Sequence, residues 1–439
     1  MPSRTDRTVR VAVLADSDTR WKWGVLTARR ISPASGAESA PAPAGFVLRG
    51  RATPTTRQLA ETAVSDTAPR EVTGAEFLRE VRDAAERGEG YDVVVLALVG
   101  GTVRAVLQGI ADLGLDRRPV LVTGYVGVVY EKLADGLLLR HGADVVLANS
   151  RHDAERFRAV YEGVGADPGS VVEAALPFLG GAPHKLEPGR DTLVFAAQPS
   201  VPVTKAERAY VLRRLVGHAR LHPDREVLLK LRSRPGEHTT HLEEFPYQKL
   251  VRDLPTPPNF RLVYGHMGEV LDRTDLLVTV SSTAALEALH RRIPTAILTD
   301  LGVREALGNH HFIGSGLLAS FDALDQGAVP EPDEEWLARQ GVGAEGLPGG
   351  IPYEKAFDAA RERVAELLAG PPPPPVAPYY TAETAGGYLP GILARHRLDL
   401  TAPEPRESGV RRIVREAARG AYRHGVQRVA PVIRRLGEL

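Results

Sequence analysis

The sequence predicts an α/β fold built from two doubly wound parallel sheets with helices on both faces. Strand-length runs of Val, Leu and Ile alternate with helical patterns from residue 9 onward, and such alternation is typical of parallel sheets. The alternation stops over residues 177–191, which are rich in Pro and Gly, and it then starts again. A chain of 439 residues is also too long for one hydrophobic core. We therefore expect two domains.

The first domain opens with a continuous apolar run over residues 9–15, which predicts a buried strand. The loop Asp16-Ser17-Asp18-Thr19 follows, and an apolar and basic segment then predicts a helix. Farther on, Thr73 and Glu76 form the pattern of a capping box, which marks a helix start. The predicted strands of this half are 9–15, 46–49, 91–98, 120–123 and 143–148, and the predicted helices are 21–30, 73–88, 103–113, 130–141 and 151–161.

The second domain repeats this organisation after the linker. A second capping box, formed by Thr204 and Glu207, predicts the start of its first helix. The last predicted strand is begun by Pro294. The predicted strands are 192–197, 226–231, 261–264, 276–280 and 295–298, and two further helices are predicted at 268–273 and 284–290.

The C-terminal part of the chain changes in composition. Residues 371–375 are a polyproline run, which predicts a stiff spacer, and aromatic and apolar residues then predict docking on the first domain. Arginines at helical spacing over 410–435 predict a basic amphipathic helix, which either lies on an anionic membrane surface or is solvated or partly disordered. We expect a first domain over 1–180, a second over 181–370, a Pro-rich linker and crossover segment over 371–409, and a basic tail over 410–439.

The composition excludes several classes of function. Lys and Arg number 55, and Asp and Glu also number 55, so no excess of positive charge indicates nucleic-acid binding. The chain has no cysteine, which excludes disulfides and thiolate chemistry. No apolar run approaches the roughly 20 residues of a membrane-spanning helix, and the polar start does not resemble a signal peptide. We expect a cytoplasmic protein, at most peripheral at the inner face of a membrane.

Residues 275–300 carry the clearest functional signal. A buried strand ends in three hydroxyl residues, Ser281, Ser282 and Thr283, and a helix follows. This order brings hydroxyl groups, free backbone N–H groups and the positive end of a helix dipole together, which suits a phosphate. Glu287 lies four residues after Thr283, so it is not the partner in a capping box, and its carboxylate could instead accept hydrogen bonds from two ribose hydroxyls. A local alternative, an N-cap serine in ordinary α/β core, stays open.

This segment resembles the nucleotide-sugar site of GT-B glycosyltransferases. Leu286-Glu287-Ala288-Leu289, followed by Arg291-Arg292-Ile293-Pro294-Thr295, is similar to the Leu-Glu-Ala and Gly-x-Pro-x pattern of many of them. The three hydroxyl residues are similar to the Ser-Ser/Thr motif of capsule-type Kdo, sialic-acid and polyol-phosphate transferases. The resemblance covers about residues 9–370 and extends to uncharacterised glycosyltransferases of the capsule or polysialyltransferase type. It implies two Rossmann-like domains, a nucleotide-sugar co-substrate on the second of them, and no cofactor or metal.

Cationic residues end the second strand of the second domain. Lys230, Arg232 and Arg234 lie at the carboxyl end of a predicted parallel strand, where α/β sheets bind ligands, and guanidinium groups clamp phosphates with paired hydrogen bonds. Capsule-type transferases carry a Lys-x-His-Pro pattern here, with the His on the donor phosphate. In this chain the nearest histidine, His238, follows the proline, so the role falls to an Arg or to His238. Gln198, in the loop after the first strand of this domain, is a further donor-binding candidate; turn and solubilising roles are the alternatives.

The first domain is expected to supply the general base. Asp16 and Asp18 end its first strand, in a loop that the GT-B resemblance places against the interdomain cleft, and a carboxylate there could take the proton of an acceptor hydroxyl. Capping of the next helix is the alternative role. Glu131 is the second candidate base. Trp21 and Trp23 could stack on a sugar face or pack in the core.

Together these residues predict a metal-independent transferase that moves a sugar from a nucleotide-activated donor to a hydroxyl acceptor, either a glycan or a lipid-linked molecule. Thr279 stands where many retaining relatives carry the first Glu of a Glu-x7-Glu pair, so the resemblance favours inversion. Adjacent His310 and His311 lack a third ligand at suitable spacing and predict no metal site. Two alternatives stay open: a nucleotide-sugar 2-epimerase of the same fold, which needs more carboxylates and histidines around the anomeric carbon, and a non-catalytic nucleotide-sugar-binding or assembly protein.

Overall fold

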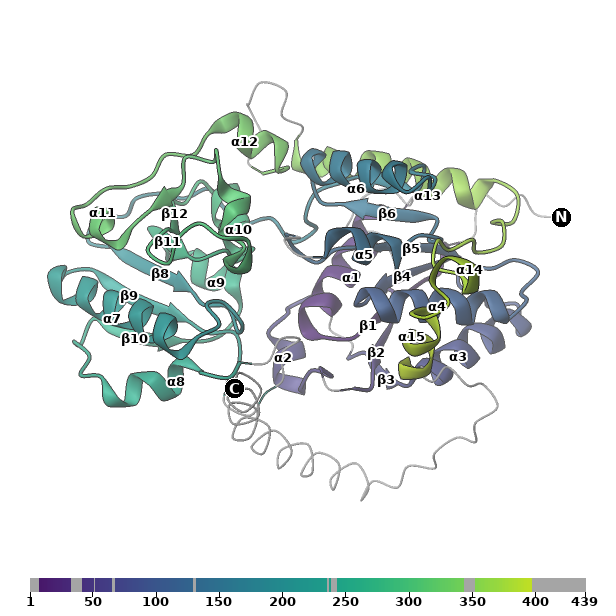
Figure 1. Ribbon diagram of the computed structural model, residues 1–439, viewed down its shortest axis with the longest axis horizontal. Coiled ribbons are helices and arrows are strands. Elements are labelled where there is room, and N and C mark those ends of the chain that lie inside the picture. Colours follow the sequence, from purple (N-terminus) through teal and green to yellow (C-terminus); the bar gives the residue numbers. More distant parts are fainter. Residues whose placement is uncertain are drawn as a thin grey trace, which may run out of the picture.

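The computed structural model describes residues 8–32, 42–50, 52–64, 68–128, 132–234, 237, 243–342 and 352–396. Over these ranges the chain forms two α/β lobes, each built around its own parallel sheet (Figure 1).

The sheet of the first lobe has seven strands in the order β3-β2-β1-β4-β5-β6-β7, all paired in parallel. In the centre of this sheet, Leu14 is in register with Phe46 on one side and Leu96 on the other. The strands are β1 (Val11–Ala15), β2 (Ala44–Leu48), β3 (Arg70–Val72), β4 (Val93–Ala97), β5 (Val120–Gly124), β6 (Val145–Ala148) and β7 (Val171–Glu173), and the helices between them are α1 (Asp18–Ile31), α2 (Thr56–Ala60), α3 (Gly74–Glu86), α4 (Gly100–Asp112), α5 (Leu133–Leu138) and α6 (Arg151–Gly163).

The sheet of the second lobe has six parallel strands in the order β10-β9-β8-β11-β12-β13. Its strands are β8 (Thr192–Ala196), β9 (Glu226–Lys230), β10 (Phe260–Val263), β11 (Leu276–Thr279), β12 (Thr295–Leu298) and β13 (Leu318–Ala319), and its helices are α7 (Lys205–Leu221), α8 (Tyr247–Leu250), α9 (Met267–Leu271), α10 (Ala284–His290), α11 (Phe321–Asp325) and α12 (Glu334–Arg339).

The local sequence explains where these elements begin. Thr73 and Thr204 each accept a hydrogen bond from the backbone N–H three residues on, and the Glu three residues on accepts one in return, so both predicted capping boxes are formed. Strands β4, β5 and β8 are buried along their full length, because helices cover both faces of each sheet. Each sheet therefore separates two apolar clusters, one on each face.

The end of the expected second domain is corrected by the packing. The chain leaves the first core after Ala175 and enters the second at Leu176. It then returns, because α13 (Asp358–Ala369) buries Ala360 and Val364 in the core of the first lobe. Residues 358–369 therefore belong to the first lobe and not to the expected domain of 181–370. An amphipathic pattern specifies that a helix packs, but it does not specify against which core.

The segment after α13 is also held on the first lobe. The guanidinium of Arg118 donates a hydrogen bond to the Pro374 carbonyl (2.9 Å), so the polyproline run is tethered along the lobe. Two short helices, α14 (Ala382–Ala385) and α15 (Leu389–His396), follow, and α15 packs on α4 (Figure 1). The predicted docking of this segment is confirmed. The basic tail, 410–439, lies outside the described residues.

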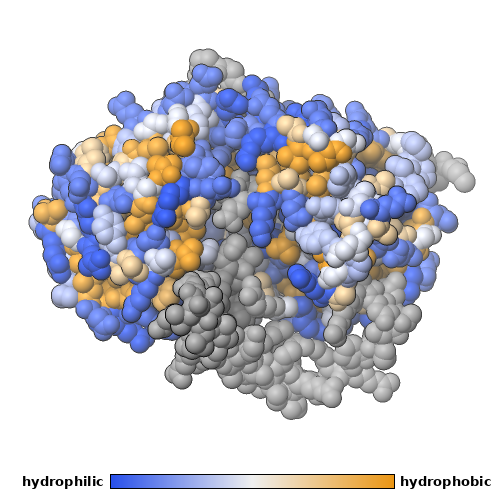
Figure 2. All heavy atoms as spheres, viewed as in Figure 1, coloured by the Kyte–Doolittle hydropathy of each residue, from blue (hydrophilic) through white to orange (hydrophobic). Residues whose placement is uncertain are grey.

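None of the helices over the described ranges has the length and apolar character needed to cross a membrane. On the face shown in Figure 2, hydrophilic and apolar residues are interleaved over both lobes.

Candidate functional site

The carboxyl ends of the two sheets face each other across the lobe interface. Helix α1, which follows β1, carries Asp18 and Lys22 to this interface. Arg232 Nη2, from the loop after β9, donates to Asp18 Oδ1 (2.7 Å). Lys22 Nζ lies 3.9 Å from Glu287 Oε2 of α10. Since α/β sheets bind ligands at their carboxyl edges, this is the candidate site.

Ser281 and Gln198 form a buried junction beneath this interface. The Ser281 hydroxyl donates to the Leu307 carbonyl (2.5 Å) and accepts from Gln198 Nε2 (3.1 Å). The backbone N–H of Ser281 donates to Gln198 Oε1 (3.0 Å). Two of the predicted donor-binding side chains are thus used to fix the loops that follow β8 and β11. Their direct contact with a donor stays a prediction, and the geometry gives them a positioning role.

The next two hydroxyl residues differ from each other. Ser282 accepts a hydrogen bond from the Ala284 N–H (3.2 Å), and its own N–H donates to Thr279 Oγ1 (3.2 Å). Thr283 makes no side-chain cap hydrogen bond. It faces the first lobe so closely that a Cβ added to Gly127 would lie 2.6 Å from Thr283 Oγ1.

The expectation of free backbone N–H groups at this elbow is therefore wrong in part. The N–H groups of Ser281, Ser282 and Ala284 are engaged by side chains of the elbow and its neighbours. A short connection that turns from a strand into a helix satisfies its own donors in this way. The Thr283 hydroxyl is the elbow side-chain group placed against the first lobe.

Lys230 provides the strongest electrostatic signal in the site. It is the last residue of β9, only 6% exposed, and its Nζ donates to the Leu231 carbonyl (2.9 Å). Burial lowers the pKa of Lys230 to about 8, while the charges of Glu61 and Glu287 act to raise it. A buried ammonium of this kind gains from an anionic partner, because burial disfavours its charge.

Glu287, on the helix that follows the elbow, has a side chain that is 12% exposed. Burial raises the pKa of its carboxyl group, and the charges of Lys22, Arg291 and Lys230 oppose that rise. Its ion-pair partner Lys22 also lies 5.1 Å from the ring centre of Phe178. Sequence reasoning missed Lys22. Its spacing of four residues from Asp18 on a predicted helix would have placed both on one face.

A third ion pair joins the lobes. Arg57 of α2 donates to both carboxylate oxygens of Glu237, from the loop after β9, and it also pairs with Glu61. None of these three residues was a sequence-based candidate. With the residues above they form what we call the cross-lobe charge cluster, which contains four acidic and four basic side chains: Asp18, Lys22, Arg57 and Glu61 from the first lobe, and Lys230, Arg232, Glu237 and Glu287 from the second.

The remaining donor candidates lie at the margin of the cluster. Arg234 places its guanidinium 5.6 Å from the ring centre of Tyr264, and its N–H donates to a carboxylate oxygen of Glu237 (2.7 Å). His238, the other donor candidate, and Glu131, the second candidate base, lie outside the described residues.

Asp16 is held by two donors at the end of β1. Its Oδ1 accepts from Arg20 Nη1 (3.0 Å), and its Oδ2 accepts from the backbone N–H of Val99 at the start of α4 (3.0 Å). Asp18 is paired with Arg232. Asp16 and Asp18 each have a cationic partner, and the partner of Asp18 comes from the second lobe.

Of the two roles left open for Trp21 and Trp23, the structure shows core packing. The two rings are 3% and 1% exposed and belong to the core of the first lobe. Helix α1 packs against its own sheet, and this packing turns both rings inward, away from the interface.

The histidine groups lie elsewhere. His311 packs at 5.7 Å from the ring of Trp336, and burial lowers its pKa to about 3. Among the described residues, three that could hold a metal ion are His218, His222 and Asp325. His218 Nδ1, however, is hydrogen-bonded to Asp325 (2.6 Å), and the guanidinium of Arg225 lies 3.2 Å from His218 Nε2. Both ring nitrogens are engaged, and the guanidinium would repel a cation.

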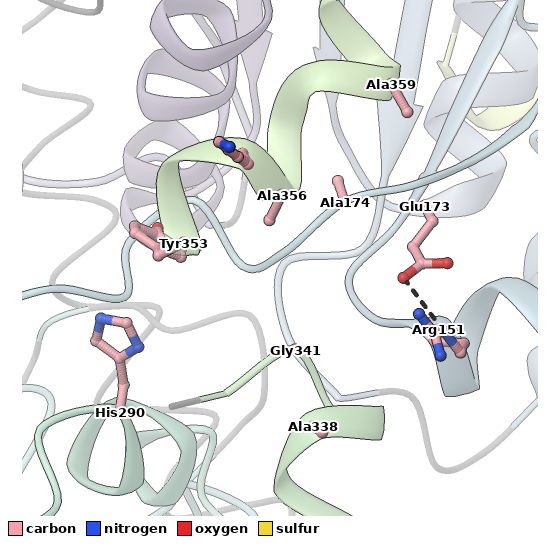
Figure 3. A pocket seen from close by; sticks show the side chains of 10 residues that line it. Arg151, Glu173, Ala174, His290, Ala338, Gly341, Tyr353, Ala356 and Ala359 are labelled. Carbon is pink, nitrogen blue, oxygen red and sulfur yellow. Dashed lines mark ion pairs between the residues drawn. The ribbon is translucent and has the colours of Figure 1, made fainter. Parts of the chain in front are cut away.

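A small cavity lies near the segments that connect the lobes (Figure 3). His290 from the C-terminal end of α10 and Tyr353 lie on its wall, and Arg151 pairs with Glu173 (3.8 Å) at its far side. Its volume is about 210 Å³, whereas pockets for drug-sized ligands measure about 300–1,000 Å³. A nucleotide sugar requires more room than this cavity offers.

Comparison with solved structures places the fold among known enzymes. UDP-GlcNAc 2-epimerase from Methanocaldococcus jannaschii is similar with a TM-score of 0.51 and 10% identity, over 82% of this chain and 100% of that chain. The glycosyltransferase SnogD from Streptomyces nogalater is similar with a TM-score of 0.41 and 16% identity, over 88% of this chain and 100% of that chain. At 10% identity the likeness to the epimerase concerns the fold alone, and the two parallel-sheet domains are typical of the GT-B fold.

Sequence comparison gives the family. No curated protein matches the chain. A family model matches residues 11–366, which span both lobes and the helix that returns to the first. The chain belongs to the family described as "Putative glycosyltransferase (DUF6716)".

Proposed function

We propose that this protein transfers a sugar from a nucleotide-activated donor to a hydroxyl acceptor, and that the donor binds at the cross-lobe charge cluster. The family and the fold support the transferase class. The observation that carries the proposal is Lys230, a buried ammonium at the carboxyl edge of the second sheet whose only hydrogen bond over the described ranges is to a carbonyl.

The donor phosphates would take the place of internal carboxylates. Arg232 is paired with Asp18, and Lys22 with Glu287, so each cation already has an anionic partner near the position proposed for phosphate. A diphosphate could contact Lys230, Arg232 and the Thr283 hydroxyl together, since charge-assisted hydrogen bonds to phosphate are about twice as strong as neutral ones. Glu287 would then be released to accept hydrogen bonds from the ribose.

The acceptor would approach from the first lobe. The resemblance stated above favours an acceptor that is a glycan or a lipid-linked molecule of envelope, exopolysaccharide or secondary-metabolite biosynthesis, and it favours inversion. In an inverting displacement the acceptor oxygen attacks the anomeric carbon while the bond to the donor phosphate breaks. A base near Asp16 and Asp18 would take the hydroxyl proton.

The test begins with nucleotide binding. Thermal stability is measured with CMP, CDP, UDP, GDP and dTDP, and one of them should raise the melting temperature, because a ligand that binds only the folded state stabilises it. The matching nucleotide sugar is then incubated with hydroxyl acceptors, with and without EDTA. We expect nucleotide release in both conditions.

Three results would contradict the proposal in different ways. If no nucleotide stabilises the protein, the donor site is wrong. If UDP-GlcNAc is converted to its C2 epimer without an acceptor, the enzyme is an epimerase. Stabilisation without turnover of any sugar donor would indicate a binding protein.

A further inference from the structure

Helix α15 brings a histidine to the carboxyl edge of the first sheet. His396 is the last residue of this helix and is half-buried. Its Nε2 lies 3.7 Å from the position that a Cβ on Gly101 would occupy, in the first turn of α4. Over the described ranges the His396 ring makes no hydrogen bond. An imidazole that is partly accessible and unpartnered is able to accept a proton.

The same turn of α4 is held by Asp16. The carboxylate of Asp16 accepts the hydrogen bond of the Val99 N–H directly before α4, so Asp16 and His396 flank one helix start. The two side chains interact electrostatically. Burial and the charge of Arg395 lower the pKa of His396, and the charge of Asp16 acts to raise it. Burial and Arg395 thus favour the neutral imidazole.

Two other charged groups near this turn, Arg20 and Arg140, make their hydrogen bonds with groups other than His396. Arg20 donates to Asp16 Oδ1 (3.0 Å). The buried Arg140 donates to the carbonyls of Leu98 and Gly124, at the ends of β4 and β5. Arg395 and Asp16 are thus the charged groups that act on the imidazole.

We propose that His396 is the catalytic residue that takes the proton from the acceptor hydroxyl. This inference rests on the proposed glycosyl transfer. In the step, the acceptor oxygen forms a bond to the anomeric carbon and its proton passes to a ring nitrogen of His396. The bond between the anomeric carbon and the donor phosphate breaks, and the nucleotide leaves with the electron pair.

The geometry favours His396 over Asp16 as the base. Both oxygens of Asp16 already accept hydrogen bonds, one from a guanidinium and one from the backbone, whereas His396 has a free ring nitrogen over the described ranges. Asp16 also lies two residues from Asp18, which touches the second lobe. The proposed base therefore stands at the carboxyl edge of the first sheet, from which Asp18 reaches the second lobe.

Three variants test the assignment through the pH dependence of kcat. The assay measures nucleotide release from the sugar donor that supports turnover, chosen from UDP-GlcNAc, UDP-glucose, GDP-mannose, dTDP-glucose and CMP-sialic acid. For a neutral base, kcat falls as pH drops through the pKa of His396. His396→Gln should lower kcat by about 10²- to 10⁴-fold and remove this acid limb.

The other two substitutions should shift the acid limb of the kcat–pH profile in opposite directions. Asp16→Asn keeps an acceptor for the Val99 N–H but removes the charge that raises the pKa of His396, so the limb should shift to lower pH. Arg395→Gln removes a charge that lowers this pKa, so the limb should shift to higher pH. Thermal stability and nucleotide-induced stabilisation should stay near the parent values in all three variants, which separates a loss of chemistry from a loss of folding or donor binding.

The outcomes are distinguishable from a failure of the proposed function. If the parent protein neither binds nor turns over any donor, the function itself is wrong and this inference falls with it. If the parent is active and folded His396→Gln retains kcat within a few-fold, His396 is not the base. If Asp16→Asn removes the acid limb while His396→Gln keeps it, the base is Asp16.

Discussion

The buried ammonium of Lys230 makes nucleotide binding depend on pH in a direction that can be worked out. In the ligand-free protein the pKa of Lys230 is about 8. If a phosphate becomes its partner, the pKa should return to at least the ordinary lysine value of about 10.4. The nucleotide then binds the protonated form, and affinity must fall as pH rises through the ligand-free pKa.

The size of the effect follows from these two values. Lys230 is about nine-tenths protonated at pH 7 and about one-tenth protonated at pH 9 when its pKa is about 8. Affinity for the nucleotide should therefore weaken about tenfold between pH 7 and pH 9, which corresponds to about 1.4 kcal/mol. At pH 8 each binding event should take up about half a proton.

Titration calorimetry measures both quantities. Binding of the stabilising nucleotide is followed at pH 7, 8 and 9, in two buffers of different ionisation enthalpy, so that proton uptake appears as a difference in observed heat. Lys230→Gln should bind more weakly at pH 7 and lose the slope. Lys205→Gln, at an exposed lysine at the start of α7, is the matched control and should keep the parent slope. An affinity of the parent that is constant from pH 7 to 9, or an unchanged slope in Lys230→Gln, would refute the reasoning.

The other predictions concern neighbouring parts of the chain. Glu287→Gln should weaken binding of a ribonucleotide more than binding of pyrophosphate, measured by titration; an equal loss for both would show that Glu287 does not touch the ribose. Ser281→Ala should lower the free energy of unfolding by about 1–3 kcal/mol in denaturant titrations, because it leaves buried partners unsatisfied; an unchanged unfolding midpoint would contradict its positioning role. Deletion of 410–439 should abolish salt-sensitive co-sedimentation with anionic vesicles and spare donor turnover; if the full chain ignores such vesicles at low salt, the membrane hypothesis for the tail fails.

The parts of the fold that are encoded locally were predictable. Helix α10 and strand β12 have the predicted bounds, because a buried run, a hydroxyl turn and a proline mark each boundary within a few residues. The strands β3 and β7 were missed. Each of them is an edge strand of three residues. Three residues are too few to show the alternation of apolar and polar side chains that predicts a strand.

The candidate site was predictable on one side only. Lys230 and Arg232 followed from the rule that ligands bind at strand ends. The partners across the interface could not be found in this way. Asp18, which pairs with Arg232, and Arg57, which pairs with Glu237, come from elements about two hundred residues away, and a sequence pattern carries no information on which edges two sheets turn toward each other. His396 could not be predicted for the same reason, since its proposed role depends on where α15 docks.

The pairing of Asp18 with Arg232 has a kinetic meaning. If the guanidinium holds the donor phosphate, the carboxylate is a tethered competitor for the same group, and a tethered competitor acts at an effective concentration in the millimolar range or above. This competition would lower the affinity for the donor and, to the same extent, the affinity for the nucleotide product. When the phosphate dissociates, Asp18 would pair with Arg232 again and oppose rebinding of the nucleotide. In such a transferase the donor would bind less tightly and the nucleotide product would dissociate faster. Faster dissociation favours repeated turnover where nucleotide sugar is plentiful.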